Sequence, residues 1–164
     1  MLNFIQANDP EMLFFVGDNL RTQGEYKKAI DVWKRGDKQG DAKCQFALGF
    51  AYEWGEGIKM NEKKAVEFYQ KAALQHLNIA IHSLALCYEQ GKGIEKDINK
   101  AIELHQIAIE YGSGDSAYSL ASIYLEGKEM PQNMDKAIEL LEKGVALGSK
   151  DSESVLAQLR NAGF

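Results

Sequence analysis

Residues 48–73 read LGFAYEWGEGIKMNEKKAVEFYQKAA, and this stretch returns twice, each time 36 residues further along the chain. The positions that recur most clearly are Leu48, Tyr52, Gly55, Lys64, Ala65 and Glu67, then Leu84, Tyr88, Gly91, Lys100, Ala101 and Glu103, then Leu120, Tyr124, Gly127, Lys136, Ala137 and Glu139. Leu156 and Gly163 begin a further round. Because a fixed period of about 20–50 residues is typical of stacked supersecondary units, the sequence predicts a repeat architecture.

Each repeat reads as two amphipathic helices joined by a loop. In the second repeat, small and apolar side chains share one stripe of a first helix, at Cys44, Ala47, Leu48, Ala51 and Tyr52. Gly55 and Gly57 end that helix. A second helix from about Asn61 places Ala65, Phe68, Tyr69 and Ala72 at helical spacing. No alternating apolar run bounded by hairpin turns competes with this interpretation, so we expect an all-α chain of antiparallel helix pairs.

The repeat register divides the chain into about four units, which we place at 10–40, 41–76, 77–112 and 113–148. The first helix is expected to start at Asp9 and Pro10, a favourable N-cap residue followed by a favourable first-turn residue. The last helix, from about Asp151, is short and polar, and we interpret 149–164 as a capping helix. We predict a single domain over 1–164, an α/α right-handed superhelix, or solenoid.

Composition and charge narrow the classes of function. The 164 residues are 45% hydrophobic and 26% charged, which is ordinary for a soluble globular protein. A net charge of −5 without a basic face argues against nucleic-acid partners and against anionic membranes. The amino-terminal residues resemble no secretory signal, and Cys44 and Cys87 are expected to be buried thiols. We therefore expect a cytoplasmic protein, a monomer or weak homodimer.

The sequence contains no recognisable catalytic or metal-binding constellation. His76, His82 and His105 fall at different positions of the repeat, and no two have the spacing of a helical metal site. The glycine-rich loops lack the frame of a phosphate-binding loop and do not follow a strand. We expect no catalytic residue, no metal and no cofactor.

The second helices carry carboxylates one turn before lysines, as at Glu67 and Lys71. The same spacing recurs at Glu139 and Lys143. Opposite charges four residues apart stabilise a helix by about 0.2–0.5 kcal/mol, so we interpret these groups as surface ion pairs rather than as acid–base catalysts.

The motif A/S-L-G/A-x-x-Y-x-x-G-x-G, then a short loop and K-A-x-x-x-Y-x-K-A-A, resembles the Sel-1-like repeat, a relative of the tetratricopeptide repeat. The best copy contains Ala47, Leu48, Gly49, Tyr52, Gly55, Gly57, Lys64, Ala65, Tyr69, Lys71, Ala72 and Ala73. The first unit looks more like a plain tetratricopeptide repeat, because its inter-helix loop is four residues shorter. The resemblance covers about 140 of the 164 residues and implies a helical solenoid that binds other proteins.

The chain also departs from the family pattern. Glu129 replaces the second loop glycine of the fourth unit and is followed by Pro131. His105 and Leu141 take the place of Tyr69. The regular cysteine pairs of the disulfide-linked family members are missing, which argues against an exported protein.

The resemblance implies that the first helix of each pair lines a concave groove. The residues that it places there are Phe14, Asp18, Arg21, Lys43, Phe46, Phe50, Glu53, Trp54, Ile79, His82, Leu86, Glu89, Gln90, Asp115, Tyr118, Ser122, Leu125 and Glu126.

Aromatic and acidic side chains in this set suggest what the groove binds. Phe14, Phe46 and Tyr118 share one position of the repeat with His82, and aromatic anchors are typical of protein interfaces. The alternative is that these rings pack sideways on neighbouring helices. The four acids Asp18, Glu53, Glu89 and Glu126 suggest a partner of basic character, although a solvated polar face is the competing interpretation.

Three hypotheses of function follow. The first is a non-enzymatic adaptor or scaffold that holds a protein or peptide in its concave groove. The second is a bacterial immunity protein that neutralises a cognate toxin by binding it, since an acidic protein suits a basic toxin surface. The third and weakest is a hydrolase-type enzyme, for which the sequence offers no site.

Overall fold

A computed structural model describes residues 9–164, and within this range the chain forms nine helices and no strand. The helices are α1 (Pro10–Thr22), α2 (Tyr26–Lys38), α3 (Ala42–Trp54), α4 (Glu62–Ala73), α5 (Asn78–Gln90), α6 (Ile98–Glu110), α7 (Gly114–Glu126), α8 (Met134–Ala146) and α9 (Lys150–Asn161). This architecture confirms the predicted all-α solenoid of helix pairs.

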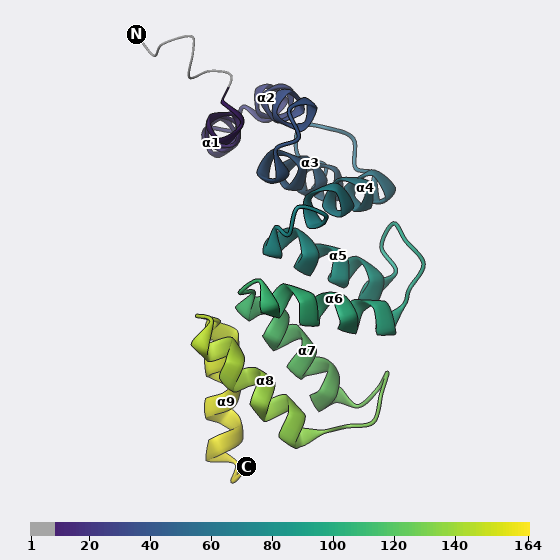
Figure 1. The fold of residues 1–164 in the computed structure, drawn as a ribbon, viewed down its shortest axis with the longest axis vertical. Coiled ribbons are helices and arrows are strands. Elements are labelled where there is room, and N and C mark those ends of the chain that lie inside the picture. Colours follow the sequence, from purple (N-terminus) through teal and green to yellow (C-terminus); the bar gives the residue numbers. More distant parts are fainter. Residues whose placement is uncertain (1–8) are drawn as a thin grey trace.

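Successive helices pair into four units, α1 with α2, α3 with α4, α5 with α6 and α7 with α8, and each unit packs on the next. The first helix of unit 1 also reaches that of unit 2, and α9 packs on both helices of unit 4. Figure 1 shows a curved stack in which the loops after α3, α5 and α7 all emerge on one side. Each unit therefore shields an apolar face of its neighbour, as expected of a solenoid.

The same residue types begin and end the helices in each unit. The side chains of Asn61, Asp97 and Asn133 accept hydrogen bonds from the third amide of α4, α6 and α8, at 3.0, 3.0 and 2.9 Å. Gly55, Gly91 and Gly127 end α3, α5 and α7 with φ of 72°, 73° and 62°, a left-handed conformation that glycine adopts without strain. These caps explain why the 36-residue motif fixes the element boundaries.

Within each unit, a small residue on the first helix lies against a large one on the second. A Cβ atom on Gly49 would lie 2.6 Å from the ring of Tyr69, and one on Gly17 would overlap the indole of Trp33. The residues at these two positions in the four units are Gly17 with Trp33, Gly49 with Tyr69, Ala85 with His105 and Ala121 with Leu141. The largest rings thus occur with glycine, and the smaller side chains occur with alanine.

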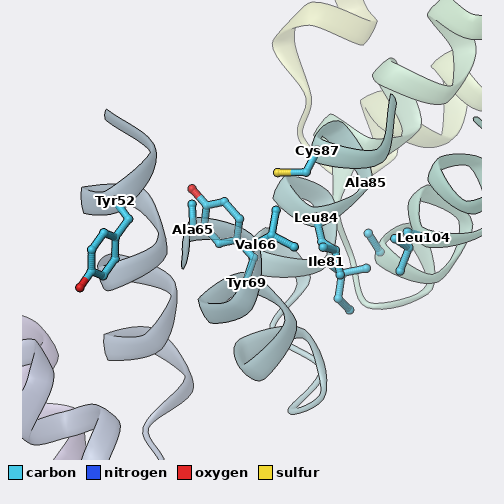
Figure 2. Close-up of a cluster of buried hydrophobic side chains, with 10 residues drawn as sticks. Tyr52, Ala65, Val66, Tyr69, Ile81, Leu84, Ala85, Cys87 and Leu104 are labelled. Carbon is cyan, nitrogen blue, oxygen red and sulfur yellow. The ribbon is translucent and has the colours of Figure 1, made fainter. Parts of the chain in front are cut away.

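Small residues also set the approach between units. A Cβ atom on Gly36 of α2 would overlap Cys44 of α3, and one on Gly144 of α8 would overlap Ser152 of α9. These two close contacts bring the helices of adjacent units together beside the apolar core. Figure 2 shows Val66 of α4 close to Leu84 of α5, in the core shared by units 2 and 3.

The two cysteines are placed as predicted, whereas a predicted helix-surface ion pair does not form. Cys44 and Cys87 are free and buried, as predicted, and burial raises the pKa of the Cys87 thiol to about 11. The predicted pairing of Glu67 with Lys71 is wrong, because the Lys71 ammonium instead lies 3.4 Å from Asp37 of the preceding unit.

The predicted pairing of Glu139 with Lys143 is also wrong. Glu139 pairs with Lys136 at 3.2 Å, and the equivalent Glu103 pairs with Lys100 at 2.7 Å. These carboxylates therefore find the lysine three residues before them, which lies on the same helix surface.

Leu84→Ala is expected to lower the free energy of unfolding by about 2–5 kcal/mol, because it opens a cavity in the core between units 2 and 3. Leu84 is 6% exposed, whereas Leu74 is 81% exposed and serves as the control, for which a change within about 0.5 kcal/mol is expected. Urea denaturation followed by circular dichroism measures both. Equal effects of the two substitutions would contradict the assignment of this core.

Gly49→Ala is expected to destabilise the chain by about 1–3 kcal/mol, since the new methyl group would overlap the Tyr69 ring. Alanine is the better helix former by about 1 kcal/mol, so a net loss reports the overlap itself. In a Tyr69→Leu background, which matches the Ala121 and Leu141 pair of unit 4, the cost should vanish. A double-mutant cycle by denaturation tests this, and an unchanged cost in both backgrounds would refute it.

Candidate functional site

The residues that the sequence assigned to a concave groove lie on α1, α3, α5 and α7, and none of them is buried. Glu53 and Glu89 retain 21% and 31% of their side-chain exposure, and Trp54 is 61% exposed as a residue. We call the surface made by these residues of the four first helices the trough.

An aromatic pocket lies in the part of the trough formed by units 1 to 3. It has a volume of about 280 Å³, and its lining comprises Phe14, Asp18, Arg21, Trp33, Phe46, Ala47, Phe50 and Ile79. Trp33 is 2% exposed and comes from α2, so the sequence analysis did not include it in the groove. The indole NH of Trp33 donates to the carbonyl of Phe14 at 3.4 Å, which ties this part of the lining to α1. Three successive first helices thus contribute to one apolar depression.

Cations lie over two rings of the trough, Phe50 and Trp54, and over the ring of Phe15 on α1. The distances from charged group to ring centroid are 5.9 Å for Arg21 and Phe50, 5.6 Å for Lys43 and Phe15, and 5.8 Å for Lys92 and Trp54. Phe50 and Trp54 are themselves 6.1 Å apart. Trp54 therefore extends the aromatic pocket along α3 while its outer face stays exposed.

The aromatic side chains that share one position of the repeat are partly packed against other helices and partly exposed. Phe46 lies 5.7 Å from Tyr69 on the second helix of its own unit, and it also lines the aromatic pocket. Tyr118 packs against the core of unit 4. The side chain at the same position in unit 3, His82, hydrogen-bonds Ser116. Sideways packing and a lined pocket are therefore both present, and the most exposed ring of the trough is that of Trp54 in unit 2.

The five acids of the trough differ in their partners. Three of them have a cation or hydrogen-bond donor within the chain. Asp18 pairs with Arg21 at 3.1 Å, and Glu126 pairs with Lys128 at 3.1 Å. Glu53 accepts a hydrogen bond from the Tyr69 hydroxyl at 2.6 Å and lies 3.8 Å from Lys92. Asp115 has no lysine or arginine partner within 4 Å among the described residues, and neither has Glu89. The Oε2 atom of Glu89 lies 3.5 Å from Nε2 of His105.

His105 and His82 form a polar contact between α5, α6 and α7. The His105 ring is 0% exposed, and neither of its nitrogens makes a hydrogen bond within the described part of the chain. Its centroid lies 5.4 Å from that of His82, whose Nδ1 is 2.9 Å from Ser116 Oγ. Burial, and secondly His105, lower the pKa of His82 to about 4 against the opposing effects of Asp115 and Glu89. His82 is thus neutral at pH 7.

Two other kinds of site are absent from residues 9–164. No group of three His, Cys, Asp or Glu side chains in this range is arranged to hold a metal ion. No helix there has the length and apolar character needed to cross a membrane.

Comparison with protein families and solved structures gives consistent matches. A family model described as Sel1 repeat matches residues 42–77, 78–113 and 114–149. A Sel1 repeat protein from Oxalobacter formigenes is 22% identical over 96% of this chain and 66% of its own, with a TM-score of 0.88. Helicobacter pylori cysteine rich protein B is 24% identical over 80% of this chain and 95% of its own, with a TM-score of 0.62.

A third solved structure matches over the full chain. The protein c5321, described as a protective antigen present in uropathogenic Escherichia coli strains, is 25% identical over 100% of this chain, with a TM-score of 0.85. The chain spans 37% of its length, and 66% of the Oxalobacter protein. No curated protein matches by sequence.

His82 is expected to titrate near pH 4, well below the ordinary histidine value of 6.5. Between these pH values the unfolded chain holds one more proton at this residue, so its contribution to stability is lost as the pH falls from about 6.5 to 4. NMR of ¹³C-labelled histidine side chains measures the midpoint. Denaturation of wild type and His82→Gln over the same range measures the stability change, and parallel pH profiles of the two proteins would refute it.

Proposed function

The chain belongs to the Sel1 repeat family, and on this premise we propose that it is an adaptor that binds a protein or peptide in the trough lined by α1, α3, α5 and α7. Sel1 repeats are protein–protein interaction modules, and the family is generally a non-enzymatic fold. The proposal adds which surface of this chain is used and which side chains hold the partner.

The aromatic pocket is the observation that carries this proposal. Phe14, Phe46 and Phe50 are only half-buried, although each comes from a helix that is otherwise packed in the stack. Covering such a surface gains about 25 cal/mol for each Å² of apolar area removed from water. Aromatic anchors at the centre of an interface are the residues that most often dominate binding energy.

The exposed Trp54 supports the same surface. Its indole is 61% exposed next to Phe50, and Lys92 of the following unit lies over it. A partner side chain placed between Trp54 and the aromatic pocket would contact units 1, 2 and 3 at once. The width of this surface favours a protein or peptide over a compact small molecule.

We also propose that the partner has basic character. The net charge of −5 supports a basic partner and argues against nucleic acid and membranes as ligands. A cytoplasmic location and a monomeric or weakly dimeric state are compatible with this proposal and do not depend on it. Toxin neutralisation is a narrower form of the adaptor proposal, in which the bound protein is a toxin.

Phe46→Ala combined with Trp54→Ala is expected to weaken partner binding at least 30-fold, about 2 kcal/mol, because both aromatic anchors are removed. The partner is first captured on immobilised wild-type protein and identified by mass spectrometry, and its affinity for each purified variant is then measured by calorimetry. A toxin among the captured proteins would support the narrower hypothesis.

The matched control is Leu74→Ala, which removes an exposed apolar side chain at the end of α4, outside the trough. It should leave the affinity unchanged. Helix content by circular dichroism verifies that the double variant remains folded. An unchanged affinity for the double variant, or an equal loss for Leu74→Ala, would place the binding surface elsewhere.

A further inference from the structure

A second depression lies in the trough, between units 3 and 4. It has a volume of about 130 Å³, and its lining comprises Glu89, Lys96, Ile98, Ser122, Ile123, Glu126, Lys128 and Glu129. Glu89 belongs to α5, and Ser122 and Glu126 belong to α7, so it continues the trough beyond the aromatic pocket. We call it the acidic cleft.

The acidic cleft occurs where the repeat motif changes. In unit 3 the loop glycine Gly93 approaches α4 so closely that a Cβ atom would overlap the backbone of Glu62. Glu129 stands at this position in unit 4, and a side chain is incompatible with such an approach. The Glu129 carboxylate instead pairs with Lys96 at 2.6 Å, at the rim of the acidic cleft.

Two of the three carboxylates of the acidic cleft already have a cation. Glu129 pairs with Lys96 at 2.6 Å, and Glu126 pairs with Lys128 at 3.1 Å. Glu89 is the carboxylate of this cleft that lacks a lysine or arginine within 4 Å among the described residues. The arrangement therefore has an excess of one negative charge, located at Glu89.

The inner oxygen of Glu89 is poorly satisfied within the chain. Glu89 Oε2 is inaccessible to solvent and makes no hydrogen bond, and the nearest basic atom is Nε2 of the fully buried His105, 3.5 Å away. Buried carboxylates are normally paired or hydrogen-bonded, so the charge of Glu89 lacks a neutralising group on its inner side. The side chain as a whole is 31% exposed, and a donor from outside the chain would approach the carboxylate from that exposed side.

Unit 2 shows what would otherwise satisfy this carboxylate. There the equivalent acid, Glu53, accepts a hydrogen bond of 2.6 Å from the Tyr69 hydroxyl and lies 3.8 Å from Lys92. In unit 3, His105 occupies the position of Tyr69 and removes the hydroxyl donor. The replacement leaves the charge of Glu89 without a lysine, arginine or hydroxyl partner inside the described part of the chain.

We propose that the acidic cleft binds the cationic side chain, lysine or arginine, of the protein or peptide that occupies the trough, with Glu89 as the carboxylate that receives it. This inference rests on the proposed function and specifies one feature of the partner. The partner then presents a large apolar side chain to the aromatic pocket and a positively charged one to the acidic cleft. The cleft volume of about 130 Å³ suits a guanidinium or ammonium group together with the last methylene groups of its side chain.

The test uses Nα-acetyl-arginine amide as the probe and Nα-acetyl-citrulline amide, its neutral isostere, as the comparison. The full chain is titrated with each, and NMR follows the ¹³C-imidazole signals of His105 and the amide signal of Ser122. Saturable shifts with the arginine compound, at a dissociation constant on the order of millimolar, and none with the citrulline compound are expected.

Two variants locate the effect. Glu89→Gln is expected to weaken binding of the arginine compound at least 10-fold. Glu103→Gln removes the same charge from the exposed side of α6, where Glu103 pairs with Lys100, and should leave the affinity unchanged. Equal binding of the citrulline compound, or unchanged binding by Glu89→Gln, would overturn the inference.

A third variant tests the role of the histidine. Ala85→Gly with His105→Tyr reproduces the Gly49 and Tyr69 pair of unit 2, so that a hydroxyl can donate to Glu89. Binding of the arginine compound, followed at Ser122, should weaken several-fold, and an unchanged affinity would count against the proposal. Because these titrations use no natural partner, a negative result leaves the adaptor proposal standing. Conversely, unchanged partner binding by Phe46→Ala with Trp54→Ala would not affect the titration with the arginine compound.

Discussion

The closest approach of neighbouring helices, set by single small residues, is the constraint on which this structure depends. Gly49 admits the Tyr69 ring within a unit, and Gly36 admits Cys44 between units. A helix pair of this length cannot bury its apolar faces alone, so each unit needs the next one at this distance. Where the second-helix side chain is smaller, as at Leu141, alanine takes the glycine position without loss of packing.

This packing constrains the trough surface of the first helices less than their buried faces, which is why the trough can differ from unit to unit. The change is clearest at two positions of the repeat, one on the first helix and one on the second. The residues there are Glu53 with Tyr69 in unit 2, Glu89 with His105 in unit 3, and Leu125 with Leu141 in unit 4. The first pair is hydrogen-bonded, the second is polar but unsatisfied, and the third is apolar. One scaffold thus carries an aromatic pocket at one end and an acidic cleft towards the other.

Charge alone would have described the trough poorly. Each first helix contributes at least one acid, which suggests a uniformly negative surface, yet Asp18, Glu53 and Glu126 are each engaged by a neighbour. An ion pair at an exposed site contributes little to stability, but it removes a charge from what a partner encounters. The negative charge that remains lies on Glu89 and Asp115, and recognition of a basic partner becomes a local property of units 3 and 4.

The helices, their caps and the face that each side chain occupies were predictable from the 36-residue period, because these depend on local backbone geometry. The pairing of side chains was not. Lys71 reaches Asp37, 34 residues earlier, instead of Glu67 one turn away, and Trp33 enters the aromatic pocket from a second helix. Such contacts depend on the distance between units and on which rotamers the neighbouring unit leaves open. Sequence spacing carries neither quantity, so the chemistry of the trough emerges only when the units are stacked.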